Sequence, residues 1–309
     1  MFIAFIPAST FVLLLYLVPP SRVLRLPRSS NEQILWRFFA VAISMILAPL
    51  PLLVLKESTH FTKHISIFDL TGLSLQCNTF SSLVWPIFVT ITLFLGPIIA
   101  SGVEIFLDTY EEVEKKEKST DLVYRLAINI YIHLTRSFNE TTFLILIRSL
   151  IVAPFSEEWA FRACTIPIIV IFCGLTNSFV VFVTCLAFAL AHVHHYLDHI
   201  RNGMSQAQAS REVLSQLSYT SVFGALEAIL FLQTGSYLGI VLPHIFCNYI
   251  GVPSMYWIQD SNTLRKFFIA SFYLVGIFTS IYLLFIGSKI INLTTSQKCL
   301  LSNIKIQNV

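Results

Sequence analysis

The segment APFSEEWAFR, residues Ala153–Arg162, places three charged side chains between long apolar runs. The chain has 309 residues, of which 55% are hydrophobic and 12% are charged, and its mean hydropathy is +0.74. That composition is typical of a membrane protein with several spans. Ionisable groups at lipid depth are costly unless they are paired or line a wet cavity. The three charges therefore indicate either a buried ion-pair network or a functional site.

Uncharged runs on both sides of this segment are long enough to cross a hydrocarbon layer, which takes about 20 residues. They cover residues 1–21, 38–55, 70–103, 163–191 and 267–288, and shorter apolar runs lie at 141–156, 213–226 and 228–243. We expect an all-α, polytopic bundle of about eight transmembrane helices, some of them short or kinked, around a cavity. The whole chain, 1–309, is predicted to be one membrane domain, with its motif-bearing core at about 141–260.

The two adjacent glutamates of the segment are expected to lie in different surroundings. If the residues after Pro154 are helical, Glu158 and Arg162 form an i, i+4 pair on one face. Glu157 is turned about 100° away from Glu158 and has no local partner. A poorly solvated carboxylate without a counter-charge has a raised affinity for protons, which suits a general base.

A second polar group ends a long apolar run in FALAHVHHYLDH, Phe188–His199. His192 is the deepest histidine, and it shares a face with His195 and His199 if the helix continues. A histidine at a helix end is often an interfacial residue, so this motif alone leaves its role open.

A third polar group lies in LPHIFCNYIGVP, Leu242–Pro253, where His244 and Asn248 are spaced i, i+4. Such side chains need a partner in an apolar setting, which is water, substrate or a neighbouring helix. Together the three segments supply a base, two imidazoles and a carboxamide. These groups are sufficient to activate water and to stabilise an oxyanion.

The ordered motifs resemble those of a known family. Glutamate-glutamate-x-x-x-arginine in APFSEEWAFR, phenylalanine-x-x-x-histidine in FALAH and histidine-x-x-x-asparagine in HIFCN are similar to the motifs of type II CAAX prenyl endopeptidases. These Ras-converting enzymes belong to the wider ABI family of intramembrane proteases. The resemblance extends from about Thr92 to Pro253. It implies a multi-pass protease of the endoplasmic reticulum membrane that removes the last three residues after a prenylated cysteine.

The resemblance also implies substrates, partners and residue roles. The substrates would be prenylated CAAX-tail proteins such as Ras- and Rho-type GTPases, approached at the lipid bilayer, and no cofactor is implied. Glu157 and His192 would activate the attacking water, while His244 and Asn248 would hold the oxyanion.

Glu158 and Arg162 would be supporting residues in the family, which agrees with the pairing expected from their spacing. Glu227, in GALEAILF, departs from the family pattern, because a carboxylate stands where an uncharged residue is expected. Its role is left open.

Besides a catalytically silent scaffold of the same fold, two other functions remain open from the sequence. Glu157, His192 and His244 could form a two-histidine, one-carboxylate zinc site, although no His-Glu-x-x-His motif is present and metal dependence stays undecided. Buried acids and histidines could also serve a transporter or proton relay, but no internal repeat supports this. The net charge of +3 is small and dispersed, so we expect no nucleic-acid partner.

Overall fold

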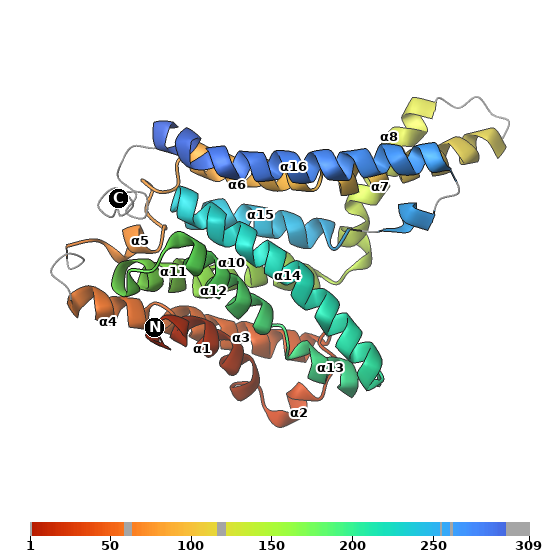
Figure 1. The fold of residues 1–309 in the computed structure, drawn as a ribbon. Helices are drawn as coiled ribbons and strands as arrows, with labels where there is room; N and C mark the ends of the chain where they lie inside the picture. Colours follow the sequence, from red (N-terminus) through yellow and green to blue (C-terminus); the bar gives the residue numbers. More distant parts are fainter. Residues whose placement is uncertain (1, 59–63, 116–121, 254, 260–261, 295–309) are drawn as a thin grey trace.

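The computed structural model describes residues 2–58, 64–115, 122–253, 255–259 and 262–294, and every regular element within these ranges is a helix (Figure 1). This confirms the predicted all-α class. The extent of the single domain predicted for 1–309 stays a prediction.

The helices lie in layers, and two outer layers enclose a central one (Figure 1). On one side, α6 (Phe80–Leu93) and α7 (Leu95–Lys115) both pack against the long α16 (Thr263–Thr294). On the opposite side, α1 (Ile6–Leu17) packs against α3 (Asn31–Leu47). The central layer carries the three motifs.

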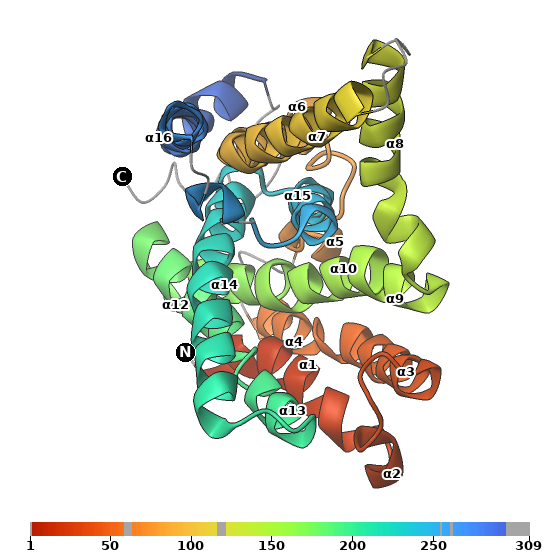
Figure 2. The ribbon, with the colours of Figure 1, turned by 90° about the vertical axis from the view of Figure 1, so that its right-hand side faces the viewer.

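In the central layer, α12 (Asn177–Leu190) packs along α14 (Gln206–Thr234), and α15 (Tyr237–Ile250) packs against both α6 and α10 (Ala153–Glu158). Figure 2 shows how α10, α14 and α15 cross one another. The remaining α-helices are α2 (Ser21–Leu24), α4 (Leu50–Ser58), α5 (Ile67–Leu70), α8 (Leu122–Glu140), α9 (Phe143–Ile147), α11 (Thr165–Pro167) and α13 (His195–Arg201); the short 3₁₀ helices are Phe2–Phe5 and Tyr256–Gln259.

The helical segment that carries the two glutamates is interrupted by π-helical turns at Arg148–Val152, Trp159–Ala163 and Ile168–Phe172. Pro154 and Pro167 lie directly beside two of these turns, and a proline has no N–H for the i to i−4 bond of an α-helix. A π turn accommodates one extra residue in the helix, and such turns are frequent at functional sites.

Within the described ranges, four helical segments are long and apolar enough to cross a membrane, and the bent pair α6–α7 adds a fifth. The two helices of this pair meet at an angle of 58°. Phe2–Leu17 and Tyr237–Ile250 are shorter apolar helices. A polytopic helical membrane bundle is therefore confirmed as the fold class, whereas the number of about eight spans stays a prediction.

Two of the long apolar runs do not form one straight helix. Within residues 70–103, α5 ends at Leu70 and α6 starts only at Phe80. Within residues 163–191, the helix stops before Gly174, whose φ of +61° is a left-handed conformation that favours glycine, and α12 starts at Asn177. The residues at these breaks include glycine and polar residues, such as Asn78 at the first and Gly174 and Asn177 at the second, but no charged residue, so a search for uncharged runs passes over them.

Helix α14 is a single element of 29 residues that joins the shorter apolar run 213–226 to much of the next. A capping box of Ser205 and Gln208 begins it, and Gly235, with a φ of +62°, ends it. Ser236 then caps α15 by accepting a hydrogen bond from the Gly239 amide. The boundary between the two helices thus lies at residues 235–236, and Glu227 lies inside α14.

Candidate active site

All four residues predicted to be catalytic line one cavity of about 530 Å³. They are Glu157 from α10, His192 from the turn after α12, and His244 and Asn248 from α15. Residues of α6, α7, α14 and α16 complete the walls. The structure therefore brings the three motifs together, although their roles stay predictions.

Glu158 links two of the motifs beneath the cavity. Its Oε1 atom accepts a hydrogen bond from Arg162 Nη1 at 3.0 Å and another from His244 Nδ1 at 2.6 Å. The side chains of Glu158 and Arg162 are fully buried, and that of His244 is 4% exposed. The predicted i, i+4 pair is confirmed. In addition, the pair fixes the orientation of the His244 ring.

Glu157 differs from its neighbour as expected, because its carboxylate reaches the cavity and its side chain is 21% exposed. Its Oε2 atom lies 3.8 Å from Nε2 of His244, which comes from α15. This distance is too long for a hydrogen bond but allows both groups to contact one small molecule between them.

His192 is held by its own chain in a state that suits a base. Its Nδ1 atom lies 2.8 Å from the carbonyl oxygen of Phe188. Because a carbonyl oxygen can only accept, Nδ1 carries the hydrogen in this contact. The Nε2 atom of the neutral ring then has a lone pair that can accept a proton.

A common helical face for His192, His195 and His199 is expected only if the helix continues, and this condition is not met. Helix α12 ends at Leu190, and α13 begins only at His195, so the three residues do not belong to one continuous helix. The rings of His192 and His195 nevertheless lie with their centres 5.6 Å apart, and His195 also contacts the guanidinium group of Arg28 at 2.9 Å.

Asn248 lies one turn after His244 on α15 and is exposed to the cavity. Its Nδ2 atom donates a hydrogen bond to the carbonyl oxygen of Ser149 at 2.9 Å. Ser149 belongs to the first π turn. This contact fixes the amide, whose second N–H group remains as a potential donor.

Two aromatic residues that were given no role from the sequence build the wall between the histidines. Phe188 contacts the rings of both His192 and His244, and the guanidinium carbon of Arg162 lies 4.2 Å from the centre of its ring. Phe223 lies against His244, with ring centres 4.7 Å apart. The sequence could have indicated the contact of Phe188 with His192, because Phe188 precedes His192 by four residues, the spacing of neighbours on one helix face.

Hydrogen bonds to backbone oxygens anchor the helices around the cavity. Tyr237 at the start of α15 donates to the carbonyl of Phe155 at 2.7 Å. Trp159 donates to the carbonyl of Met45 at 3.0 Å. Because His244 also joins Glu158, α15 is connected to α10 at two points along its length.

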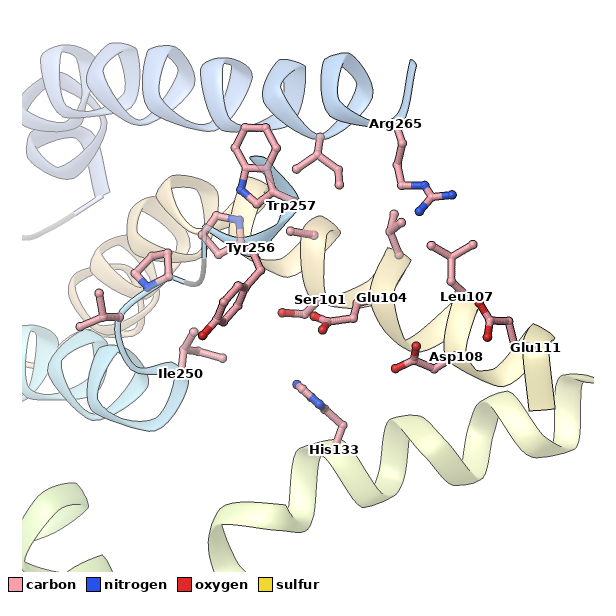
Figure 3. A pocket seen from close by; sticks show the side chains of 16 residues that line it. Ser101, Glu104, Leu107, Asp108, Glu111, His133, Ile250, Tyr256, Trp257 and Arg265 are labelled. Atoms are coloured by element: carbon pink, nitrogen blue, oxygen red, sulfur yellow. The ribbon is translucent and has the colours of Figure 1, made fainter. Parts of the chain in front are cut away.

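A second cavity of about 500 Å³ adjoins the first, and both are lined by Pro97, Val252 and Pro253. Figure 3 shows its polar side chains, with His133 of α8 directed toward the acidic residues of α7. Arg265, at the start of α16, lies on the far side of this space (Figure 3). The two cavities lie next to each other beside α7 and the end of α15.

The cavity holds the three residues that could form the zinc site left open by the sequence, Glu157, His192 and His244. In the part of the chain that the structure describes, no three histidine, cysteine, aspartate or glutamate side chains are arranged to hold a metal ion. The set of Glu157, His192 and His244 is therefore brought to one cavity without forming a recognisable metal-binding cluster.

Comparison with known proteins identifies relatives of this chain. Residues 139–250 match the family model described as type II CAAX prenyl endopeptidase Rce1-like. This range contains all three motifs. No solved structure matches the chain.

Curated relatives extend the similarity beyond that range. The chain is 34% identical to CAAX prenyl protease 2 of Homo sapiens over 233 residues, which cover 74% of this chain and 65% of the relative. It is 30% identical to CAAX prenyl protease 2 of Arabidopsis thaliana over 257 residues, which cover 81% of this chain and 78% of the relative. A probable CAAX prenyl protease 2 of Schizosaccharomyces pombe is 32% identical over 179 residues.

The match therefore spans a little less than two thirds of the human relative but more than three quarters of the plant relative. With the motifs in order and their side chains around one cavity, the chain belongs to the type II CAAX prenyl endopeptidase family.

Proposed function

We propose that the chain cleaves prenylated CAAX proteins and releases the three residues that follow the prenylated cysteine. The observation that carries this proposal is the convergence of Glu157, His192, His244 and Asn248 on one cavity in a membrane helix bundle. Family membership supports the substrate class, with Ras- and Rho-type GTPases as the proposed substrates. The endoplasmic reticulum membrane is the proposed location.

The hydrolysis begins with a water molecule held beside Glu157 and His192. Glu157 accepts one proton from this water, the unprotonated Nε2 atom of His192 accepts a hydrogen bond from the other O–H group, and the oxygen attacks the scissile carbonyl carbon. When the tetrahedral intermediate collapses, the carbon–nitrogen bond breaks and the leaving amine takes the proton from the base. Both groups are then returned to their initial state.

Negative charge develops on the carbonyl oxygen during the attack, and donors on α15 stabilise it. His244 and Asn248 can both donate to this oxygen, and such donors are more effective where water is excluded. Glu158 and Arg162 do not contact the substrate in this mechanism. They hold His244 in place through the contacts described above.

The cavity also suits an amphipathic substrate. Apolar residues of several helices line it, among them Leu93, Val222, Leu226 and Ile277. They provide surroundings for a prenyl chain. The adjoining polar cavity provides a route for the peptide backbone, which carries hydrogen-bonding groups that need polar partners.

The direct test is incubation of the purified protein with a fluorogenic farnesylated peptide, with and without exhaustive chelation. We expect release of an intact tripeptide in both samples, because the proposed base and donors are side chains. The same peptide without its farnesyl group serves as the control. Activity that is lost on chelation and restored by zinc would instead support the metalloprotease alternative.

Replacing Asn248 by alanine is expected to lower kcat by about 10²–10³-fold, the usual effect of removing one oxyanion donor. Steady-state kinetics with the farnesylated peptide measure this loss. The control is Asn202→Ala, which removes an exposed amide between α13 and α14. Equal activity of the two variants would remove Asn248 from the proposed oxyanion site.

A further inference from the structure

Glu227 is a fully buried acid that belongs to none of the three motifs. Within the described residues, neither of its carboxyl oxygens has a hydrogen-bond partner. The carbonyl of Gly224, one turn earlier on α14, accepts a hydrogen bond from Arg162 Nη2 at 3.4 Å. Residues three apart on a helix share a face, so Glu227 is directed toward the buried pair of Glu158 and Arg162. Its carboxyl group interacts electrostatically with both.

The contacts of His244 define what this ring needs in order to stabilise an oxyanion. Its Nδ1 atom lies 2.6 Å from a carboxylate oxygen of Glu158, and that oxygen can only accept, so Nδ1 carries a hydrogen. The other nitrogen, Nε2, faces the cavity and Glu157. A neutral ring would present a lone pair there. His244 can donate from Nε2 only when it holds a second proton and is positively charged.

That positive charge requires compensation because His244 is buried. Glu158 and Arg162 cancel each other, and an additional uncompensated charge in such a place is strongly unfavourable. The charged or titratable groups that surround His244 are Glu157 and Glu158 of α10, Arg162 of the following π turn, His192 after α12, Glu227 of α14, and Cys247 of its own helix. Two of these acids, Glu157 and Glu227, are not paired with Arg162. Glu157 is partly solvated and is assigned to activating the water. Glu227 is therefore the remaining acid.

We propose that Glu227 is the counter-charge that allows His244 to hold its second proton, and that it thereby acts as a positioning residue for the oxyanion donor. The cluster of Glu158, Arg162 and Glu227 carries one excess negative charge when all three are ionised, and it is neutral once it retains one proton. That proton is available to His244 as negative charge develops on the substrate. This inference rests on the proposed proteolysis and adds a residue to its machinery.

Glu227→Gln tests the proposal because it keeps the size of the side chain and removes its charge. Without the counter-charge, His244 loses its second proton more readily, so activity should fall at a lower pH than in the unmodified protein. We expect the alkaline limb of the kcat profile to move down by about one pH unit, which is about a tenfold loss on that limb. KM should be unchanged. At the acid end of the pH profile, the activity of Glu227→Gln should approach that of the unmodified protein. Glu227→Asp restores the charge and should restore the pH dependence.

Thr234→Val is the matched control. Thr234 is a buried polar residue on the same helix, and its hydroxyl donates to the Leu230 carbonyl of its own helix. We expect the pH profile of this variant to equal that of the unmodified protein. If Glu227→Gln also leaves the profile unchanged, or lowers kcat equally at every pH, Glu227 has no electrostatic role in catalysis and the proposal fails.

A second measurement separates this inference from the proposed function. Carbon-13 labelling of the histidine rings allows the titration of His244 to be followed by NMR in the purified protein, with the resonance assigned by its loss in His244→Gln. The midpoint should move to lower pH in Glu227→Gln. An unchanged midpoint overturns the inference even if the protein cleaves CAAX peptides. A shifted midpoint in a protein without cleavage would instead overturn the proposed function.

Discussion

Glu157→Gln is expected to lower kcat for a farnesylated CAAX peptide by about 10²–10⁴-fold, the contribution typical of a general base. Glutamine has nearly the same shape but cannot accept the proton of the attacking water. The cavity and the contacts of His244 with Glu158 should persist, so KM and thermal stability should change little. Steady-state kinetics and a thermal unfolding curve on the same preparation measure both effects.

The control for this variant is Glu212→Gln, which removes an exposed carboxylate from the first part of α14. It should cleave at the rate of the unmodified protein. His192→Ala should lose activity to a similar degree as Glu157→Gln, because both groups contact the same proposed water. A Glu157→Gln protein that keeps its activity would show that the base has been assigned to the wrong residue.

Arg162→Met is expected to destabilise the protein by about 3–5 kcal/mol, because it leaves Glu158 buried without its counter-charge. Methionine also cannot reproduce the contact of the guanidinium group with the Phe188 ring. His244 should then lose its fixed orientation, and cleavage should fall together with stability. Unfolding in detergent micelles measures the stability, and peptide cleavage measures the second effect.

A double substitution separates these two effects. Glu158→Leu combined with Arg162→Met removes both buried charges and should recover much of the stability, since apolar replacements of a buried ion pair are often neutral or stabilising. Cleavage should stay low because the acceptor for His244 Nδ1 is missing. Arg211→Met, on the exposed part of α14, controls for loss of an arginine. Exposed ion pairs contribute less than about 1 kcal/mol to stability. A loss of stability in Arg162→Met within that range would contradict the prediction.

Much of the site could be predicted because its order is local. The pairing of Glu158 with Arg162, and the different surroundings of Glu157, follow from the period of a helix. Likewise, the placement of His244 and Asn248 on one helix needed only their spacing. Charged residues are so costly in apolar surroundings that their presence also indicated where the segments would meet.

The parts that could not be predicted depend on tertiary packing and on breaks in helices. The contacts of Asn248 with Ser149 and of His195 with Arg28 join segments that are distant in sequence. The helix break at Gly174 occurs within a run that contains no charged residue. Glu227 could be recognised as unusual, but only the fold places it beside the Glu158–Arg162 pair.

The length of α14 sets the depth in the bilayer at which the proposed scissile bond would lie. At about 1.5 Å per residue, its 29 residues extend for about 44 Å, whereas the hydrocarbon layer is about 30 Å thick. If Thr234 reaches one boundary of that layer, roughly nine residues at the other end project into the headgroups and water. Gln216, Tyr219 and Thr220, which line the cavity, then lie just inside the opposite boundary. The proposed cleavage of a lipid-anchored tail would then take place with the anchor still immersed and the folded protein still in water.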